Sequence, residues 1–118
     1  MGESTPEELT TTESGLQYRI LRAADGPKPS AADTVTVHYK GELLDGTEFD
    51  SSYARNEPAT FPLRGVIAGW TEGLQLVAEG GMIELVIPSE LGYGERGAGS
   101  DIPPHSTLRF VVELHKIN

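Results

Sequence analysis

One stretch of the chain has the spacing of a dinucleotide-binding loop. Residues 92–97 read Gly-Tyr-Gly-Glu-Arg-Gly, which matches the G-x-G-x-x-G pattern, and a predicted strand precedes them. In a nucleotide site this loop opens a helix, because the helix N-terminus binds the phosphate. Here the chain runs into Ile102-Pro103-Pro104 instead, and the carboxylate of Glu95 would repel phosphate. We therefore interpret residues 91–104 as a surface loop rather than a nucleotide site.

Metal and nucleophile chemistry find little support in the sequence. The three histidines, His38, His105 and His115, lie far apart and share no ligand spacing, and the chain has no cysteine. His38 and His115 fall on the expected solvent face of two strands. Serines are plentiful, but none sits in a nucleophile elbow. We predict no metal site and no covalent catalysis.

Asp50 is the carboxylate whose position allows two interpretations. It follows Phe49, which should point inward at the end of a short strand. The local sequence favours a turn cap that leads into Ser51 and Ser52. The alternative is a polar group placed beside a buried aromatic side chain, where it could serve a binding site.

The aromatic residues form the most informative set. They come from extended segments, a loop and a predicted helix, and a small chain often uses such residues only as core. A concave apolar pocket with a few polar groups is, however, the usual form of a small-ligand site. The set comprises Tyr39, Phe49, Trp70, Tyr93 and Phe110.

A helix over residues 66–81 must position the only tryptophan. Its apolar residues follow a spacing of three or four and share one face. They are Ile67, Trp70, Leu74 and Val77. Gly69 and Gly73 also share a face, and each costs a helix roughly 1 kcal/mol relative to alanine. We expect a strand to approach the helix closely at these glycines, and Gly80-Gly81 to end it.

The remaining chain reads as strands and turns. Alternating apolar residues and turn signals such as Asp45-Gly46 predict an antiparallel α+β domain with about five strands and one helix. Strands are expected at 16–22, 34–43, 47–50, 82–88 and 107–117, with a short extended piece at 61–63 and a loop at 51–58. Residues 1–14 are acidic and poor in apolar side chains, so we expect a flexible segment before a domain over 15–118.

Composition limits the partners. The 118 residues suffice for one domain, and the formal net charge of -9 argues against nucleic acid, which needs a basic surface. No apolar run approaches the roughly 18 residues of a membrane span, and no signal peptide is visible. We expect no membrane association and a cytoplasmic location, or a periplasmic one if the chain is an excised domain.

The combined motifs resemble those of the FKBP-type peptidyl-prolyl cis-trans isomerases. The resemblance covers residues 12–118 and is greatest to the bacterial group typified by the macrophage infectivity potentiator. The motifs are T-x-S-G-L-Q-Y at 12–18, V-H-Y-x-G at 37–41, D-G-T-x-F-D-S-S at 45–52, V-I-x-G-W-x-E-G at 66–73, L-G-Y-G-E at 91–95, I-P-P at 102–104 and L-x-F-x-V-E-L at 108–114.

This resemblance implies a half-open antiparallel sheet of five to six strands wrapped around one short α-helix, with a proline pocket on the concave side. Trp70 would be the floor, and the rim would carry Asp50 and Tyr93. Arg55 would pair with Asp50 and Tyr93, and the Ile67 N–H would hold the peptide. The implied walls are Tyr39, Phe49, Val66, Ile67 and Phe110, and Phe61 and Ile102 complete the implied binding set.

The implied activity is rotation about X–Pro bonds in proline-containing peptides and unfolded proteins, without a cofactor. The catalytic residues would be Tyr39, Phe49, Asp50, Trp70 and Tyr93. Rapamycin and tacrolimus become candidate ligands, although Ala59 and residues 98–101 depart from the family's aromatic pattern. A monomer is expected, because the group's long dimerisation helices are absent. The competing hypotheses are a proline-binding module without catalysis and a purely structural domain.

Overall fold

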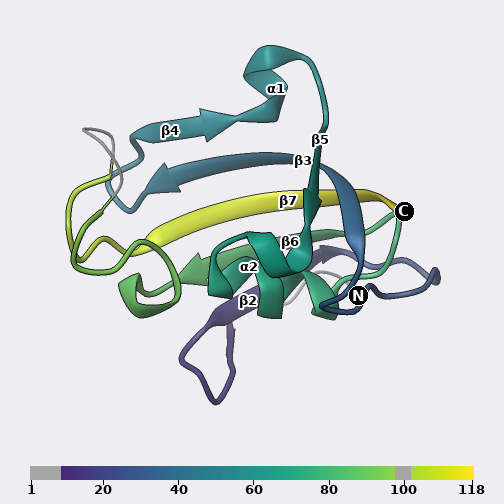
Figure 1. The fold of residues 1–118 in the computed structure, drawn as a ribbon, viewed down its shortest axis with the longest axis horizontal. Coiled ribbons are helices and arrows are strands. Elements are labelled where there is room, and N and C mark those ends of the chain that lie inside the picture. The colour runs from purple at the N-terminus through teal and green to yellow at the C-terminus, as the bar shows by residue number, and fades with distance from the viewer. Residues whose placement is uncertain (1–8, 98–101) are drawn as a thin grey trace, which may run out of the picture.

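The computed structural model describes residues 9–97 and 102–118. A seven-stranded sheet, antiparallel at every strand pair, runs in the order β1-β2-β6-β7-β3-β4, and β5 also pairs with β3 (Figure 1). The strands are β1 Thr10–Thr11, β2 Gln17–Arg22, β3 Thr34–Leu43, β4 Glu48–Ser51, β5 Ala59–Pro62, β6 Met82–Ile87 and β7 Leu108–Ile117. The helices are α1 Ser52–Arg55 and α2 Ala68–Gly73, and the 3₁₀ turns are Leu63–Gly65, Leu74–Leu76 and Ser89–Leu91.

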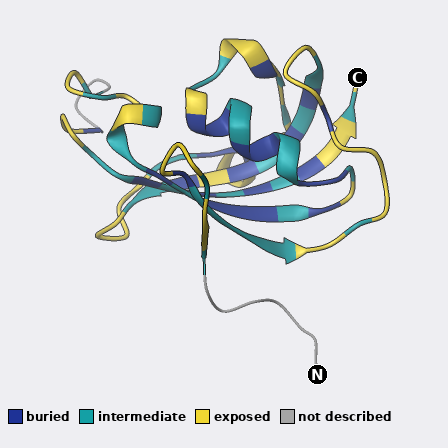
Figure 2. Cartoon of the chain, turned by 90° about the horizontal axis from the view of Figure 1, so that it is seen from below, coloured by how far each residue is buried: buried dark blue, intermediate teal, exposed yellow. Residues whose placement is uncertain are grey.

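The core lies between α2 and one face of the sheet. Figure 2 shows α2 against this face, with buried residues where the two meet. On β6 and β7 the alternate residues predicted to face inward are all buried, because a strand places every second side chain on the same face. They are Ile83, Leu85, Ile87, Leu108, Phe110, Val112 and Leu114. The predicted α+β fold class is confirmed.

The sheet approaches α2 most closely at its two glycines, Gly69 and Gly73. A Cβ added at Gly69 would lie 2.6 Å from Ile87 Cγ2, and one at Gly73 would lie 2.5 Å from Leu85 Cδ2. No real Cβ tolerates such distances, so only glycine lets α2 lie this close to β6. The predicted close approach of a strand is confirmed.

The helix is shorter than the apolar spacing predicted. The α-helical part ends at Gly73, a 3₁₀ turn follows over Leu74–Leu76, and Val77 is extended with φ -113° and ψ 141°. Val77 is still buried. The glycines that admit the sheet lower the helix propensity, and helix ends commonly tighten into 3₁₀ geometry.

Two further expectations need correction. The predicted loop at 51–58 contains α1, which the Ser51 side chain caps by accepting a hydrogen bond from Ala54 N at 3.2 Å. Asn56 ends α1 in the left-handed conformation with φ 55°.

Thr10 and Thr11 pair with β2 although they belong to the segment predicted to be flexible. Residues 1–8 of that segment lie outside the described residues. A single helical turn and a two-residue strand are too short to leave a periodic pattern.

Gly69→Ala should destabilise the fold by about 1–3 kcal/mol, although alanine is the better helix former. The new methyl group meets three side-chain atoms of Ile87, which is fully buried and branched at Cβ. Gly73→Ala is the matched comparison and should cost a similar amount, because its methyl group would meet three side-chain atoms of Leu85, which is also fully buried. Urea denaturation measures both. A Gly69→Ala protein as stable as wild type would contradict the close packing.

No helix within residues 9–97 and 102–118 is long and apolar enough to cross a membrane.

Candidate functional site

A pocket of about 450 Å³ opens where the N-terminal end of α2 meets strands β3, β5 and β7. The chain folds this way because β5 leads through the Leu63–Gly65 turn directly into α2, so residues 65–67 form one edge of the opening. The loop that follows the Ser89–Leu91 turn closes another edge with Tyr93. The lining residues are Tyr39, Asp50, Phe61, Gly65, Val66, Ile67, Trp70, Tyr93 and Phe110.

Three aromatic rings surround Trp70 at the floor of this pocket. Tyr39, Phe61 and Phe110 meet its indole edge-to-face, with centroids 5.2, 5.6 and 5.3 Å away and interplanar angles of 85°, 89° and 84°. Edge-to-face contacts are favourable because the positive ring edge meets the negative ring face. The four rings make a rigid apolar wall that leaves the central space open.

Two donors at the floor, one from a side chain and one from the backbone, find no acceptor in the described part of the protein. Trp70 is 4% exposed, and its Nε1 finds no hydrogen-bond partner among the described residues. The Ile67 N–H precedes the first turn of α2 and is likewise without an acceptor in the part of the chain that the structure describes. Since a buried donor without a partner is costly, Trp70 Nε1 favours a ligand that carries an acceptor, and the N–H of the half-buried Ile67 is available to the same ligand.

Asp50, Tyr39 and Arg55 form a closed hydrogen-bonded triangle at the rim. The Tyr39 hydroxyl donates to Asp50 Oδ2 at 2.5 Å, and Arg55 donates to Asp50 Oδ1 at 2.7 Å and to the Tyr39 oxygen at 3.1 Å. The helix α1 brings Arg55 back over Asp50, five residues earlier in the chain. The cap interpretation of Asp50 is therefore wrong: Ser51 caps α1, and Asp50 faces the pocket.

This triangle fixes the protonation of its members. Burial alone would raise the pKa of Asp50, but the hydrogen bonds from Tyr39 and Arg55 outweigh it and hold that pKa below its ordinary value. Burial and the bond to Asp50 raise the pKa of Tyr39. The rim thus presents an ionised carboxylate beside a protonated phenol at neutral pH.

Tyr93 stands apart from the triangle. It is 39% exposed at the pocket mouth, and burial followed by the nearby charge of Asp50 raises the pKa of its hydroxyl. Arg55 pairs with Tyr39 rather than with Tyr93. The phenol of Tyr93 therefore stays protonated and can donate to a ligand.

Three of the predicted binding residues do not line the pocket. Phe49 supports it from behind through an edge-to-face contact with Phe110 at 5.5 Å, which Gly41 permits because any Cβ there would touch both rings. Ile102 is buried in the core. Arg55 is hydrogen-bonded within the rim triangle. Their roles in binding remain predictions.

Gly65 lines the pocket and was missed by sequence reasoning. A residue that contributes mainly backbone to a wall leaves no side-chain signal in the sequence. Residues 98–101, which depart from the family's aromatic pattern, lie outside the described part of the chain.

His38 and His115 lie on the solvent-facing side of their strands, as predicted, but the sequence did not indicate that they meet. His38 and His115 meet with ring centroids 5.1 Å apart, because β3 and β7 are neighbours, and Tyr53 stacks on His38 at 4.8 Å. His38 Nδ1 is 2.7 Å from Ser52 Oγ, which also accepts from Tyr39 N. Within the described residues no group of three or more His, Asp or Glu could hold a metal ion.

The contribution of Asp50 to the isomerase activity that the resemblance implies should be independent of pH between about 5 and 8. Its pKa is lowered in the folded protein, so the carboxylate is ionised throughout this range and loses its charge only as pH falls below about 4. We expect the kcat/KM of wild type, divided by that of Asp50→Asn, to stay constant from pH 8 to 5. In more acidic buffer this ratio should fall towards one, because protonated Asp50 has lost the charge that asparagine also lacks. A ratio that already falls near pH 6 would contradict the lowered pKa.

Comparisons with known proteins agree on one family. The profile of the FKBP-type peptidyl-prolyl cis-trans isomerases matches residues 26–115. The chain is 58% identical over 111 residues to the FKBP-type 22 kDa peptidyl-prolyl cis-trans isomerase of Escherichia coli, covering 94% of this chain and 54% of that protein. It is 49% identical over 106 residues to the peptidyl-prolyl cis-trans isomerase Mip of Coxiella burnetii, covering 90% and 46%.

Solved structures show the same similarity. The crystal structure of FkpA from Escherichia coli superposes with a TM-score of 0.92 at 51% identity, over 96% of this chain and 53% of that one. AtFKBP13 gives a TM-score of 0.87 at 35% identity, over 94% and 99%. The chain thus spans about half the length of the curated relatives it matches and the full length of a smaller solved one.

Proposed function

Because the chain belongs to the FKBP-type peptidyl-prolyl cis-trans isomerase family, we propose that it catalyses rotation about X–Pro bonds in peptides and unfolded proteins. The main support for this proposal is the open aromatic pocket around Trp70, with an ionised carboxylate and a phenol at its rim. A purely structural domain would fill this space with its own side chains, whereas about 450 Å³ stays open.

The reaction makes modest chemical demands. The barrier to rotation is about 20 kcal/mol, and the uncatalysed step takes tens to hundreds of seconds. No covalent bond breaks, so no nucleophile is needed. The planar amide is stabilised by charge-separated resonance, and the twisted amide has less of it. An apolar pocket therefore destabilises the planar form relative to the twisted one.

The polar groups of the pocket can bind the twisted amide more tightly than the planar one. The four rings would hold the proline, while the Ile67 N–H and the Tyr93 hydroxyl are free to donate to substrate carbonyls. Hydrogen bonds that fit only the twisted geometry lower the barrier, because they are stronger in the transition state than in the ground state. Asp50 is already hydrogen-bonded to Tyr39 and Arg55, so its role is electrostatic orientation rather than proton transfer.

A refolding assay limited by prolyl isomerisation, together with a protease-coupled peptide assay, tests the proposal. We expect acceleration of both, with inhibition by rapamycin or tacrolimus and a change in the emission of Trp70, the only tryptophan. A change in Trp70 emission without any acceleration would instead support a proline-binding module. Unchanged rates and unchanged emission would reject both functions for this pocket.

A double-mutant cycle separates the rim triangle from Tyr93. Tyr39→Phe and Asp50→Asn should be coupled by about 0.5–3 kcal/mol in kcat/KM, because the two side chains share a hydrogen bond and Arg55. The pair Tyr93→Phe and Asp50→Asn should show weaker coupling, since no hydrogen bond joins them. Stronger coupling of Asp50 to Tyr93 than to Tyr39 would show that the triangle is rearranged in the substrate complex.

A further inference from the structure

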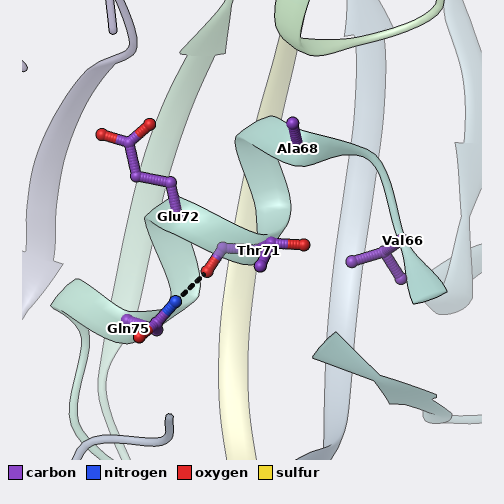
Figure 3. Close-up of a pocket in the computed structure, with 5 residues that line it drawn as sticks. All are labelled: Val66, Ala68, Thr71, Glu72 and Gln75. Carbon is purple, nitrogen blue, oxygen red and sulfur yellow. Dashed lines mark hydrogen bonds between the residues drawn. The ribbon is translucent and has the colours of Figure 1, made fainter. Parts of the chain in front are cut away.

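A second, shallow groove of about 560 Å³ borders the proline pocket. Its lining residues Ala68, Thr71, Glu72 and Gln75 are spaced as i, i+3, i+4 and i+7, so they share the outward face of α2 and the turn that follows it. Val66 lines both cavities. Figure 3 shows these five side chains, with Val66 beside the start of the helix and the Glu72 carboxylate standing clear of the ribbon. A peptide leaving the proline pocket past Val66 would enter this groove.

The groove combines an apolar floor with one charge. Thr71 donates to the Leu63 carbonyl at 2.5 Å, and the Gln75 amide donates to the Thr71 carbonyl at 2.8 Å, so both are engaged with the protein itself. Val66, Ala68 and the Thr71 methyl group remain as apolar surface. Glu72 is the only charged side chain of the lining.

The charge of Glu72 is not neutralised within the described chain. Its Oε1 accepts a hydrogen bond from Ser14 Oγ, a neutral donor, at 2.5 Å, and none of the ion pairs among the described residues includes Glu72. Of the side chains that line the two cavities, only Asp50 and Glu72 are charged, and Asp50 is paired with Arg55. Among the described residues, Glu72 is therefore the one charged lining side chain of the two cavities without a cationic partner.

We propose that this groove selects substrates with a lysine or arginine near the proline, its aliphatic stem on Val66 and Ala68 and its cationic head at Glu72. Long basic side chains bury their stems on apolar surface while the charge reaches a partner. The inference rests on the proposed isomerase function, because it assigns the groove to the same peptide. The helical face spans about 10 Å, and an extended chain advances about 3.3–3.6 Å per residue. The basic residue thus lies two to four positions from the proline.

The selection acts on binding rather than on the rotation. Glu72 contacts the peptide away from the twisting amide, so its attraction is the same in the planar and twisted states. Such uniform binding lowers KM and leaves kcat unchanged. An exposed ion pair contributes roughly a two- to fivefold difference in affinity and is weakened by salt.

The test uses synthetic alanine-rich peptides with one Leu-Pro bond and Lys, Gln or Glu at each position within four residues of it. We expect roughly two- to fivefold lower KM for Lys than for Gln at one or two positions, with equal kcat. Glu72→Gln keeps the acceptor for Ser14 and should abolish the preference for Lys peptides. Glu72→Lys should reverse the preference, so that the peptides with Glu have the lower KM. Asp25→Asn removes one negative charge in the exposed loop between β2 and β3 and should leave the preference intact.

Equal KM for all peptides, or a preference that survives in Glu72→Gln, would overturn the proposal. Dissociation constants of the same peptides, followed by Trp70 emission, keep the two hypotheses separate. A chain that binds peptides without accelerating isomerisation would contradict the proposed activity, and its dissociation constants would still show or lack the dependence on Glu72.

Discussion

Replacing Asp50 with leucine should lower kcat/KM roughly five- to a hundredfold without unfolding the protein. The loss corresponds to about 1–3 kcal/mol, the usual cost of one hydrogen bond or oriented charge that acts in the transition state. Activity should fall without vanishing, because the aromatic pocket and Tyr93 remain. The side chains of Asp50 and Arg55 are 41% and 49% exposed, so Arg55 can be solvated when its partner is removed.

Asp50→Asn refines the same experiment. Asparagine keeps the shape and one acceptor but removes the charge, so a loss similar to that of leucine would assign the effect to the charge. Asp25→Asn is the control for net charge, because Asp25 is exposed and lines neither cavity. Circular dichroism checks that each variant is folded. Wild-type kcat/KM in both Asp50 variants would leave a pocket that works by apolar burial alone.

Trp70→Ala should destabilise the protein by about 3–5 kcal/mol, the largest stability effect we expect from one site-residue substitution. Trp70 is 4% exposed, and three rings would lose their edge-to-face partner. The floor of the pocket would also disappear. Urea denaturation followed by circular dichroism measures the change, since the variant has no tryptophan to report it.

Trp70→Leu separates the two roles of this residue. Leucine retains part of the buried volume, so the stability cost should be smaller than with alanine, while the flat floor is still lost. We expect kcat/KM of folded Trp70→Leu to fall even at temperatures where the variant is fully native. If Trp70→Ala cost less than 1 kcal/mol, Trp70 would not join the core to the pocket as the structure indicates.

The sequence alone determined the features that depend on local periodicity. The alternation on β6 and β7 placed their buried faces correctly, because the two-residue period of a strand assigns side chains to faces without further information. The pair Gly69 and Gly73 indicated close contact with a strand, because such glycines are costly in a helix unless something needs the space. The ordered motifs indicated the family and the residues around Trp70.

The tertiary structure decided which of these residues meet. The family resemblance predicted Arg55 as the partner of Asp50, but it did not predict Tyr39. The pairing of β3 with β4 and the turn of α1 bring Tyr39 and Arg55 together at Asp50. His38 and His115 looked unrelated until β3 and β7 paired. The groove at Glu72 adjoins the pocket because Val66 lines both cavities. Such contacts depend on strand register and on one-turn elements, which join distant residues and leave no repeating pattern along the chain.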